Sequence, residues 1–172
     1  MTTQPPRPSR AKQFAAIERI SVFGAVARMG PVGLWQYADA YKRAAETLPA
    51  PEVPYEPVRY YLACHAIELC LKAYLSVHGA TMLDLAENAY GHNLDRLLAA
   101  ADQRGLSAAI PLPAEHRAEV HKAADYYAGK LFEYPAVGEA IRAYPGLPNI
   151  DSLLEVARIL VTALAEPCLN AQ

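Results

Sequence analysis

The chain has 172 residues, a length that suits one domain and leaves little room for two independent cores. Its 16 basic and 18 acidic residues give a net charge of −2, which argues against a highly basic nucleic-acid coat but allows a local basic patch. Apolar residues make up 53% and charged residues 20%, so a folded core is expected and wholesale disorder is not. Three cysteines are too few for a disulfide scaffold.

The first ten residues contain three prolines and no apolar period. We expect residues 1–10 to form a disordered tail and residues 11–172 to form a single helical domain. Residues 11–29 have a mixed pattern that fits a helix or an extended segment, and we expect a helix there. No segment has the apolar core of an export signal or the roughly 20 apolar residues of a bilayer span. The sequence therefore predicts a cytoplasmic protein without a membrane partner.

From residue 31 onward, apolar residues recur every three or four positions, which is the period of an amphipathic helix. The first such segment runs from Pro31 to about Leu48 and is ended by a group of prolines. The second runs from about Val58 to His78 and stops at Gly79, a residue typical of helix ends. A short helical turn is expected around residues 83–87.

Three further helices are predicted in the second half of the chain. One begins at residues 92–93 and closes at Gly105, and the next begins after Pro113. Residues 134–148 read as a long connection, after which Asn149 can cap the last helix. The residues expected to face inward are Leu94, Leu97, Leu98, Ala101, Val120, Ala123, Ala124, Tyr127, Ile150, Leu153, Leu154, Ala157, Leu160, Val161 and Leu164. With no strand-like alternation, the prediction is an all-α, up-and-down bundle of four to five helices.

The helix expected over residues 58–78 is apolar on two opposite sides, which is typical of the central helix of a bundle. Because an unpaired buried charge is costly, its polar side must face a groove, a partner or an internal polar network. Glu68 and Lys72 have the favoured i, i+4 order, so they can hold the bundle in register or line a functional groove. This narrow polar seam consists of Tyr61, His65, Glu68, Lys72 and Ser76.

Three motifs occur together in this chain. Residues 61–75, YLACHAIELCLKAYL, contain an E-L-x-L-K pattern, and residues 91–98, GHNLDRLL, open the next helix. Residues 129–135, GKLFEYP, place a lysine before a Y-P pair. Together the motifs resemble the HEPN superfamily over roughly residues 31–165. The resemblance implies a helical bundle, often a homodimer, tied to nucleotide or RNA binding in toxin–antitoxin, phage-defence or RNA-processing systems.

HEPN ribonucleases resemble one another in a motif in which an arginine is followed, after four to six residues, by a histidine. The arginine stabilises the phosphate charge, and the histidine supplies acid–base chemistry. Arg59 and His65 have a matching count, but on a regular helix they lie about 9 Å apart along the axis and about 120° apart around it. They cannot converge on one phosphate. Arg117 and His121 share a helix face but are too close in sequence. We expect no catalysis, with a metal-independent RNA-cleaving toxin using Arg117 and His121 as the alternative.

Metal chemistry is a further possibility that the sequence does not favour. The pairs His65-x-x-Glu68 and His116-x-x-Glu119 reverse the order used by bundle di-iron sites, so we expect no metal and no cofactor. His92, at the start of a helix, can instead reach Glu68 from the adjacent helix as a structural latch.

The leading hypothesis is a HEPN-like module that binds a nucleotide, RNA or a protein partner. Lysine would meet phosphate as a point charge, and tyrosine could stack on a base. The predicted binding or polar-network residues are Tyr61, His65, Glu68, Lys72, His92 and Lys130. A purely structural dimerisation module is a third interpretation, in which an aromatic interface is formed by Tyr126, Tyr127, Phe132 and Tyr134. The alternative for these rings is that they close the end of the bundle. Expected partners are a second copy of the chain and a cognate antitoxin or nucleotidyltransferase.

Overall fold

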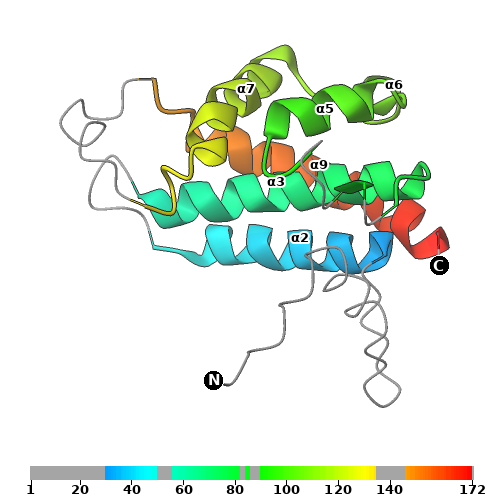
Figure 1. Ribbon diagram of the computed structural model, residues 1–172. Helices are drawn as coiled ribbons and strands as arrows, with labels where there is room; N and C mark the ends of the chain where they lie inside the picture. The colour runs from blue at the N-terminus through cyan, green and yellow to red at the C-terminus, as the bar shows by residue number, and fades with distance from the viewer. Residues whose placement is uncertain (1–29, 50–55, 82–83, 86–89, 135–145, 172) are drawn as a thin grey trace, which may run out of the picture.

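The computed structural model describes residues 30–49, 56–81, 84–85, 90–134 and 146–171. Within these ranges the protein is an all-helical bundle without strands (Figure 1), which confirms the predicted fold class. The expected tail over residues 1–10 and helix over residues 11–29 lie outside these ranges, as does most of the turn at 83–87. The helices are α2 (Pro31–Thr47), α3 (Pro57–Val77), α5 (Leu94–Asp102), α6 (Leu106–Ala109), α7 (Ala114–Ala128) and α9 (Ile150–Asn170).

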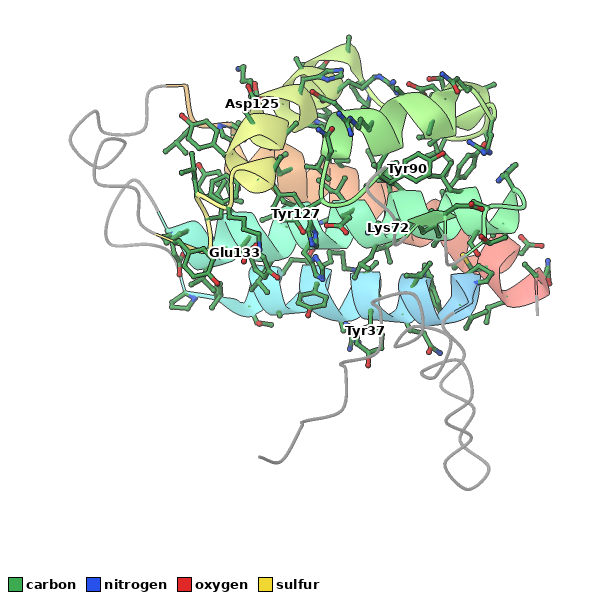
Figure 2. All side chains as sticks on the ribbon, in the orientation of Figure 1. Tyr37, Lys72, Tyr90, Asp125, Tyr127 and Glu133 are labelled. Atoms are coloured by element: carbon green, nitrogen blue, oxygen red, sulfur yellow. The ribbon has the colours of Figure 1, made fainter. Side chains whose placement is uncertain are left out.

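Helix α3 is the central helix, as its two apolar sides predict. It packs against α2, α9, α5 and α7. Figure 1 shows α2 running antiparallel along one side of α3, with α5 and α7 on the other side and α9 behind. Figure 2 shows the side chains that fill the spaces between these helices. In the described part of the chain, the only polar or charged side chain in the core is Glu68, which is 1% exposed.

The helix boundaries follow from local sequence. Both α2 and α3 begin with a proline in the first turn, where a missing backbone N–H costs no helical hydrogen bond. The Asn93 side chain caps α5 by accepting from the Arg96 amide at 2.9 Å. Asn149 caps α9 in the same way through the Ser152 amide, also at 2.9 Å, as predicted. These two caps mark the starts of α5 and α9.

Two features of the fold depart from the sequence prediction. The one-turn helix α6 follows Gly105, which adopts a left-handed φ of 88°, and four residues are too few to show a helical period. Helix α9 continues past Pro167 to Asn170, beyond the predicted apolar stripe. Proline removes only one helical hydrogen bond there, and the next residue, the fully buried Cys168, keeps the helix end on the bundle.

Side chains tie the first and last helices together across the bundle. The indole Nε1 of Trp35 in α2 donates to the carbonyl of Val161 in α9 at 2.8 Å. Nearby, Arg158 of α9 forms an ion pair with Glu46 of α2, with Nε and Oε1 2.6 Å apart. Among the described residues, no helix is both long enough and apolar enough to span a bilayer.

Candidate functional site

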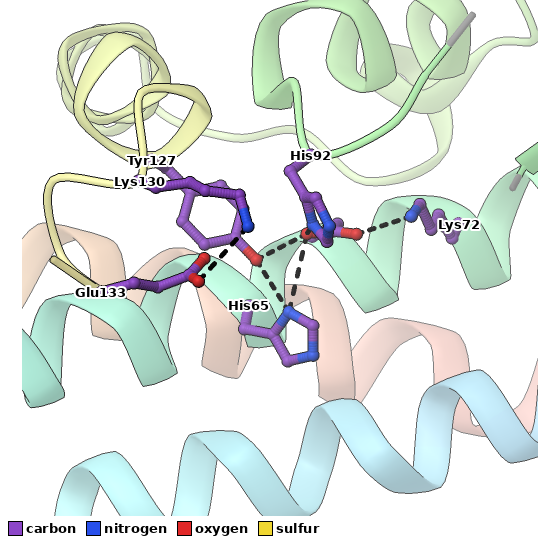
Figure 3. A network of polar contacts seen from close by, with 7 residues as sticks. His65, Lys72, His92, Tyr127, Lys130 and Glu133 are labelled. Carbon is purple, nitrogen blue, oxygen red and sulfur yellow. Dashed lines mark hydrogen bonds and ion pairs between the residues drawn. The ribbon is translucent and has the colours of Figure 1, made fainter. Parts of the chain in front are cut away.

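The polar seam of α3 is centred on the carboxylate of Glu68, which receives donors from three separate segments. Figure 3 shows these donors, Lys72, His92 and Tyr127, converging on it. Lys72, one turn further along α3, places Nζ 2.6 Å from Oε1. The hydroxyl of Tyr127 in α7 donates to Oε2 at 2.6 Å. His92, in the turn before α5, places Nδ1 2.9 Å from the same oxygen. The buried charge is therefore paired and hydrogen-bonded, as a stable core requires.

The hydrogen-bond roles of both histidines follow from their partners. Since the Tyr127 hydroxyl donates to Glu68, it must accept from Nδ1–H of His65, which lies 2.7 Å away. A carboxylate oxygen only accepts, so Nδ1 of His92 also carries a hydrogen. In their neutral forms, both imidazoles then have a free lone pair on Nε2. The cluster thus presents two oriented imidazoles around one carboxylate.

The surroundings of Glu68 keep it ionised. Burial by itself raises the pKa of this carboxyl group, but the facing His65, Lys72 and Tyr127 side chains outweigh burial, and the pKa lies well below its ordinary range. Burial and then the Glu68 charge raise the pKa of Tyr127 far above its usual value, so its hydroxyl remains a donor. The arrangement is a fixed negative charge held by neutral and cationic donors.

Aromatic side chains pack around His65. Tyr41 of α2 meets the imidazole edge-on, with ring centroids 4.5 Å apart. Tyr61, one turn earlier on α3, stacks on the other side at 5.5 Å and lies 6.1 Å from the ring of Tyr127. These contacts fix the orientation of the His65 ring, whose side chain is only 16% exposed.

Lys130 lies at the edge of the cluster, next to Tyr127 (Figure 3). Its Nζ is 3.5 Å from Oε2 of Glu133, and its side chain is 53% exposed. Its backbone φ is 59°, the only positive φ of a non-glycine residue in the described part of the chain. This left-handed residue closes the C-terminal turn of α7, where the Leu131 amide donates to the Tyr126 carbonyl at 2.9 Å, as at many helix ends.

The structure brings together most of the predicted residues. His65, Glu68, Lys72 and His92 share one polar network, and Tyr61 contacts it through its ring. Lys130 instead pairs with Glu133. The network also contains Tyr127, which the sequence assigned to an apolar stripe and to the aromatic interface but not to the polar seam, because a tyrosine at core spacing gives no sign of where its hydroxyl points.

The two arginine–histidine pairs engage other groups. Arg59 donates to the backbone carbonyls of Leu48 and Pro49 at the end of α2, far from the contacts of His65, so this pair does not converge. Further along the chain, Arg117 forms an ion pair with Asp102, and Nδ1 of His121 lies 2.6 Å from Oδ1 of Asp95.

These α7 side chains therefore fasten α7 to α5. The guanidinium of Arg117 also lies 3.3 Å from the Ser107 hydroxyl. A substrate phosphate would have to displace Asp102 to reach Arg117. His121 is 56% exposed and accessible from solvent.

The predicted aromatic interface near α7 is wrong for two of its members. Phe132 is 5% exposed and stacks between Tyr60 and Tyr126, with centroids 5.2 and 5.7 Å away. Tyr127 is 2% exposed. Both side chains close the end of the bundle, because burial between helices stabilises aromatic rings more than exposure does. Tyr134, at 64% exposed, is the accessible member.

Potential metal ligands occur in the same cluster. One ligand atom from each of His65, Glu68 and His92 lies within 4.8 Å of the others. The second histidine–glutamate pair of the sequence, His116 and Glu119, does not join this cluster. The Glu119 carboxylate instead accepts from Lys122 and from the backbone amide of Asn149 at 2.6 and 2.7 Å.

Comparison of the chain with protein-family models, with curated proteins and with solved structures finds no match.

Proposed function

We propose that this chain is a HEPN-like, non-catalytic helical module of the cytoplasm that binds the phosphate of a nucleotide or RNA at the rim of the Glu68 cluster. The family part of the proposal rests on the motifs at residues 61–75, 91–98 and 129–135. The resemblance further suggests a role in a toxin–antitoxin or defence-type system. The observation that carries the binding proposal is the pair of half-exposed basic side chains at this rim, His92 and Lys130.

The chemistry of the rim suits a phosphorylated ligand. His92 and Lys130 are each 53% exposed and come from different segments, and both lie next to Tyr127. Glu68 fixes the His92 ring through Nδ1, so when the imidazole is protonated its outer nitrogen Nε2 can donate to a phosphate without loss of rotamer freedom on binding. The ammonium group of Lys130 can exchange Glu133 for phosphate at small cost, because the ion pair is exposed. The partly buried Tyr61 ring offers a stacking surface for a base.

Titration with nucleoside mono-, di- and triphosphates and with short single-stranded RNAs tests this proposal. We expect saturable binding that weakens with salt and that is reduced at least about tenfold in Lys130→Ala. Lys122→Ala is the matched control, because Lys122 is also 53% exposed and also pairs with a glutamate three residues away. Absence of binding at every salt concentration, or equal loss in both lysine variants, contradicts the proposal.

An RNA-cleaving enzyme is the second candidate function, and the observation that favours it is the contact of His121 with Asp95. A carboxylate that holds Nδ1–H leaves Nε2 of an exposed imidazole available for proton transfer. The engagement of Arg117 by Asp102 weighs against it. Metal-independent RNA cleavage that is abolished in His121→Ala would establish the enzyme over the binding module.

We also propose that the protein acts with partners, as the resemblance implies: a second copy of the chain and a cognate antitoxin or nucleotidyltransferase. Light scattering of the purified protein tests the homodimer, and a monomer at all concentrations contradicts it. The exposed Tyr134 is a suitable interface probe, since Tyr134→Ala alters the surface without touching the core.

A further inference from the structure

The oxygen Oε2 of Glu68 accepts two hydrogen bonds and has a third side-chain nitrogen close by. The hydroxyl of Tyr127 and Nδ1 of His92 lie 2.6 and 2.9 Å away, and Nδ1 of His65 lies 3.6 Å away on a third side. Two imidazole nitrogens and one carboxylate oxygen thus converge on a common point. From this convergence we propose that His65, Glu68 and His92 form a binding site for one divalent transition-metal ion, of which Zn²⁺ is the representative.

The ligand types match such an ion. Two histidines and one glutamate form the protein ligand set of several zinc enzymes, and two histidines with one carboxylate also hold Fe²⁺. Around Zn²⁺, with metal–ligand distances of about 2.0–2.1 Å, neighbouring ligand atoms are about 3.4 Å apart. The separations of 2.9 and 3.6 Å between Oε2 and the two Nδ1 atoms lie on either side of this value. Because all three ligand atoms lie within 4.8 Å of one another, small rotations of the imidazoles would bring their separations to about 3.4 Å.

The protonation states are also compatible with metal binding. Oε2 of Glu68 already faces hydrogen-bond donors, and each neutral imidazole needs only to move its hydrogen from Nδ1 to Nε2 to offer a lone pair to the ion. The ion would bind Oε2, while Oε1 keeps its hydrogen bond from Lys72. Ligating carboxylates are commonly held in this way through their second oxygen. Nδ1 of His65 would exchange its hydrogen bond with the Tyr127 hydroxyl for the ion, while that hydroxyl continues to donate to Oε2.

Access to the site is provided by His92. Its side chain is 53% exposed, whereas Glu68 is buried and His65 is 16% exposed. An ion would therefore enter from solvent past His92 and find the other two ligands already in place. The three cysteines are buried, so the thiols do not offer a competing surface site in the folded protein.

The test is a titration of the chelator-treated full-length protein with Zn²⁺, monitored by calorimetry, and with Co²⁺, monitored by its visible absorption. We expect one ion per chain, a higher melting temperature with Zn²⁺, and at least about tenfold weaker binding in His92→Ala. Loss of even an outer partner of a metal ligand typically weakens binding by that factor. Mg²⁺ should not replace Zn²⁺, because it prefers all-oxygen sites.

Two variants make the result specific. His121→Ala is the matched control, because His121 is 56% exposed and also holds one carboxylate through Nδ1, but belongs to no group of three potential metal ligands within the described residues. Lys130→Ala should retain the Zn²⁺ affinity even where it loses nucleotide binding, which separates this site from the proposed function. Absence of stoichiometric binding, or an affinity unchanged in a folded His92→Ala variant, overturns the proposal.

Discussion

His92 and Glu68 are 24 positions apart in sequence, and the imidazole Nδ1 of one lies 2.9 Å from the carboxylate Oε2 of the other. This hydrogen bond joins the turn before α5 to the middle of the central helix. Because α5 begins two residues after His92 and packs against α3, the contact helps to set where α5 lies on the central helix. It is also the contact that the sequence predicts from His92 and the polar seam of α3.

Replacing His92 with alanine should lower the free energy of unfolding by about 1–3 kcal/mol, the usual range for a hydrogen bond to a charged group. Urea unfolding followed by the fluorescence of the single tryptophan, Trp35, measures the change. In His121→Ala the change should be smaller, since both partners of that pair are about half exposed. A His92→Ala protein of unchanged stability would contradict a structural role for the contact.

Replacing Glu68 with glutamine should destabilise the protein by about 3–5 kcal/mol at pH 7, because Lys72 loses its anionic partner in a buried setting. In Glu155→Gln, the matched surface control whose carboxylate is 45% exposed, the loss should stay below about 0.5 kcal/mol.

The low pKa of Glu68 predicts that the stabilisation lost in Glu68→Gln depends on pH. The pKa of Glu68 is lower in the folded protein than its ordinary value of 4.5, so the folded state binds the proton less readily than the unfolded state. The stabilisation by Glu68 is then complete above pH 4.5 and decreases as the pH falls below it. The stability difference between the wild type and Glu68→Gln should narrow from about pH 5 to about pH 2 in urea titrations. A difference that stays constant or widens in acid would show that Glu68 is not held ionised.

Removing the hydroxyl of Tyr127 should cost about 1–3 kcal/mol, because Glu68 and His65 both lose a partner while the ring remains. Tyr127→Phe isolates this effect from packing. The matched control is Tyr37→Phe, whose ring is 66% exposed and which should change stability by less than about 0.5 kcal/mol. Equal unfolding curves for the two variants would exclude the buried hydroxyl from the network.

The three cysteine thiols should be unreactive in the native protein. Cys64, Cys70 and Cys168 are each 0% exposed, and burial raises the pKa of all three, that of Cys168 to about 11. At pH 8 a colorimetric thiol reagent should label them slowly in buffer and completely in denaturant. Rapid labelling of one thiol in buffer would reveal local opening of the bundle.

The helix pattern of this chain is largely readable from its sequence. The proline starts of α2 and α3 and the asparagine caps of α5 and α9 are local signals that act within one turn. The short α6 and the extension of α9 past Pro167 are not readable, because they depend on what Leu106 and Cys168 bury in the assembled bundle.

The candidate site is readable only in part. A charged residue on a helix with two apolar sides must find partners, which is why Glu68 and the reach of His92 could be inferred. The roles of Tyr127 and Tyr41 could not, since both fit an apolar stripe and only tertiary packing aims their polar or aromatic edges at His65. The pairing of Lys130 with Glu133 depends on the positive φ of Lys130, which a lysine at that position gives no reason to predict.

A double-mutant cycle between Glu68 and His92 tests most directly the claim that this contact holds the turn before α5 against the central helix. The free energies of unfolding of the wild type, Glu68→Gln, His92→Ala and the double variant give the coupling energy. We predict a favourable coupling of about 1–3 kcal/mol, the range for residues in one hydrogen-bonded network. A coupling below about 0.3 kcal/mol, as found for independent sites, would contradict the account.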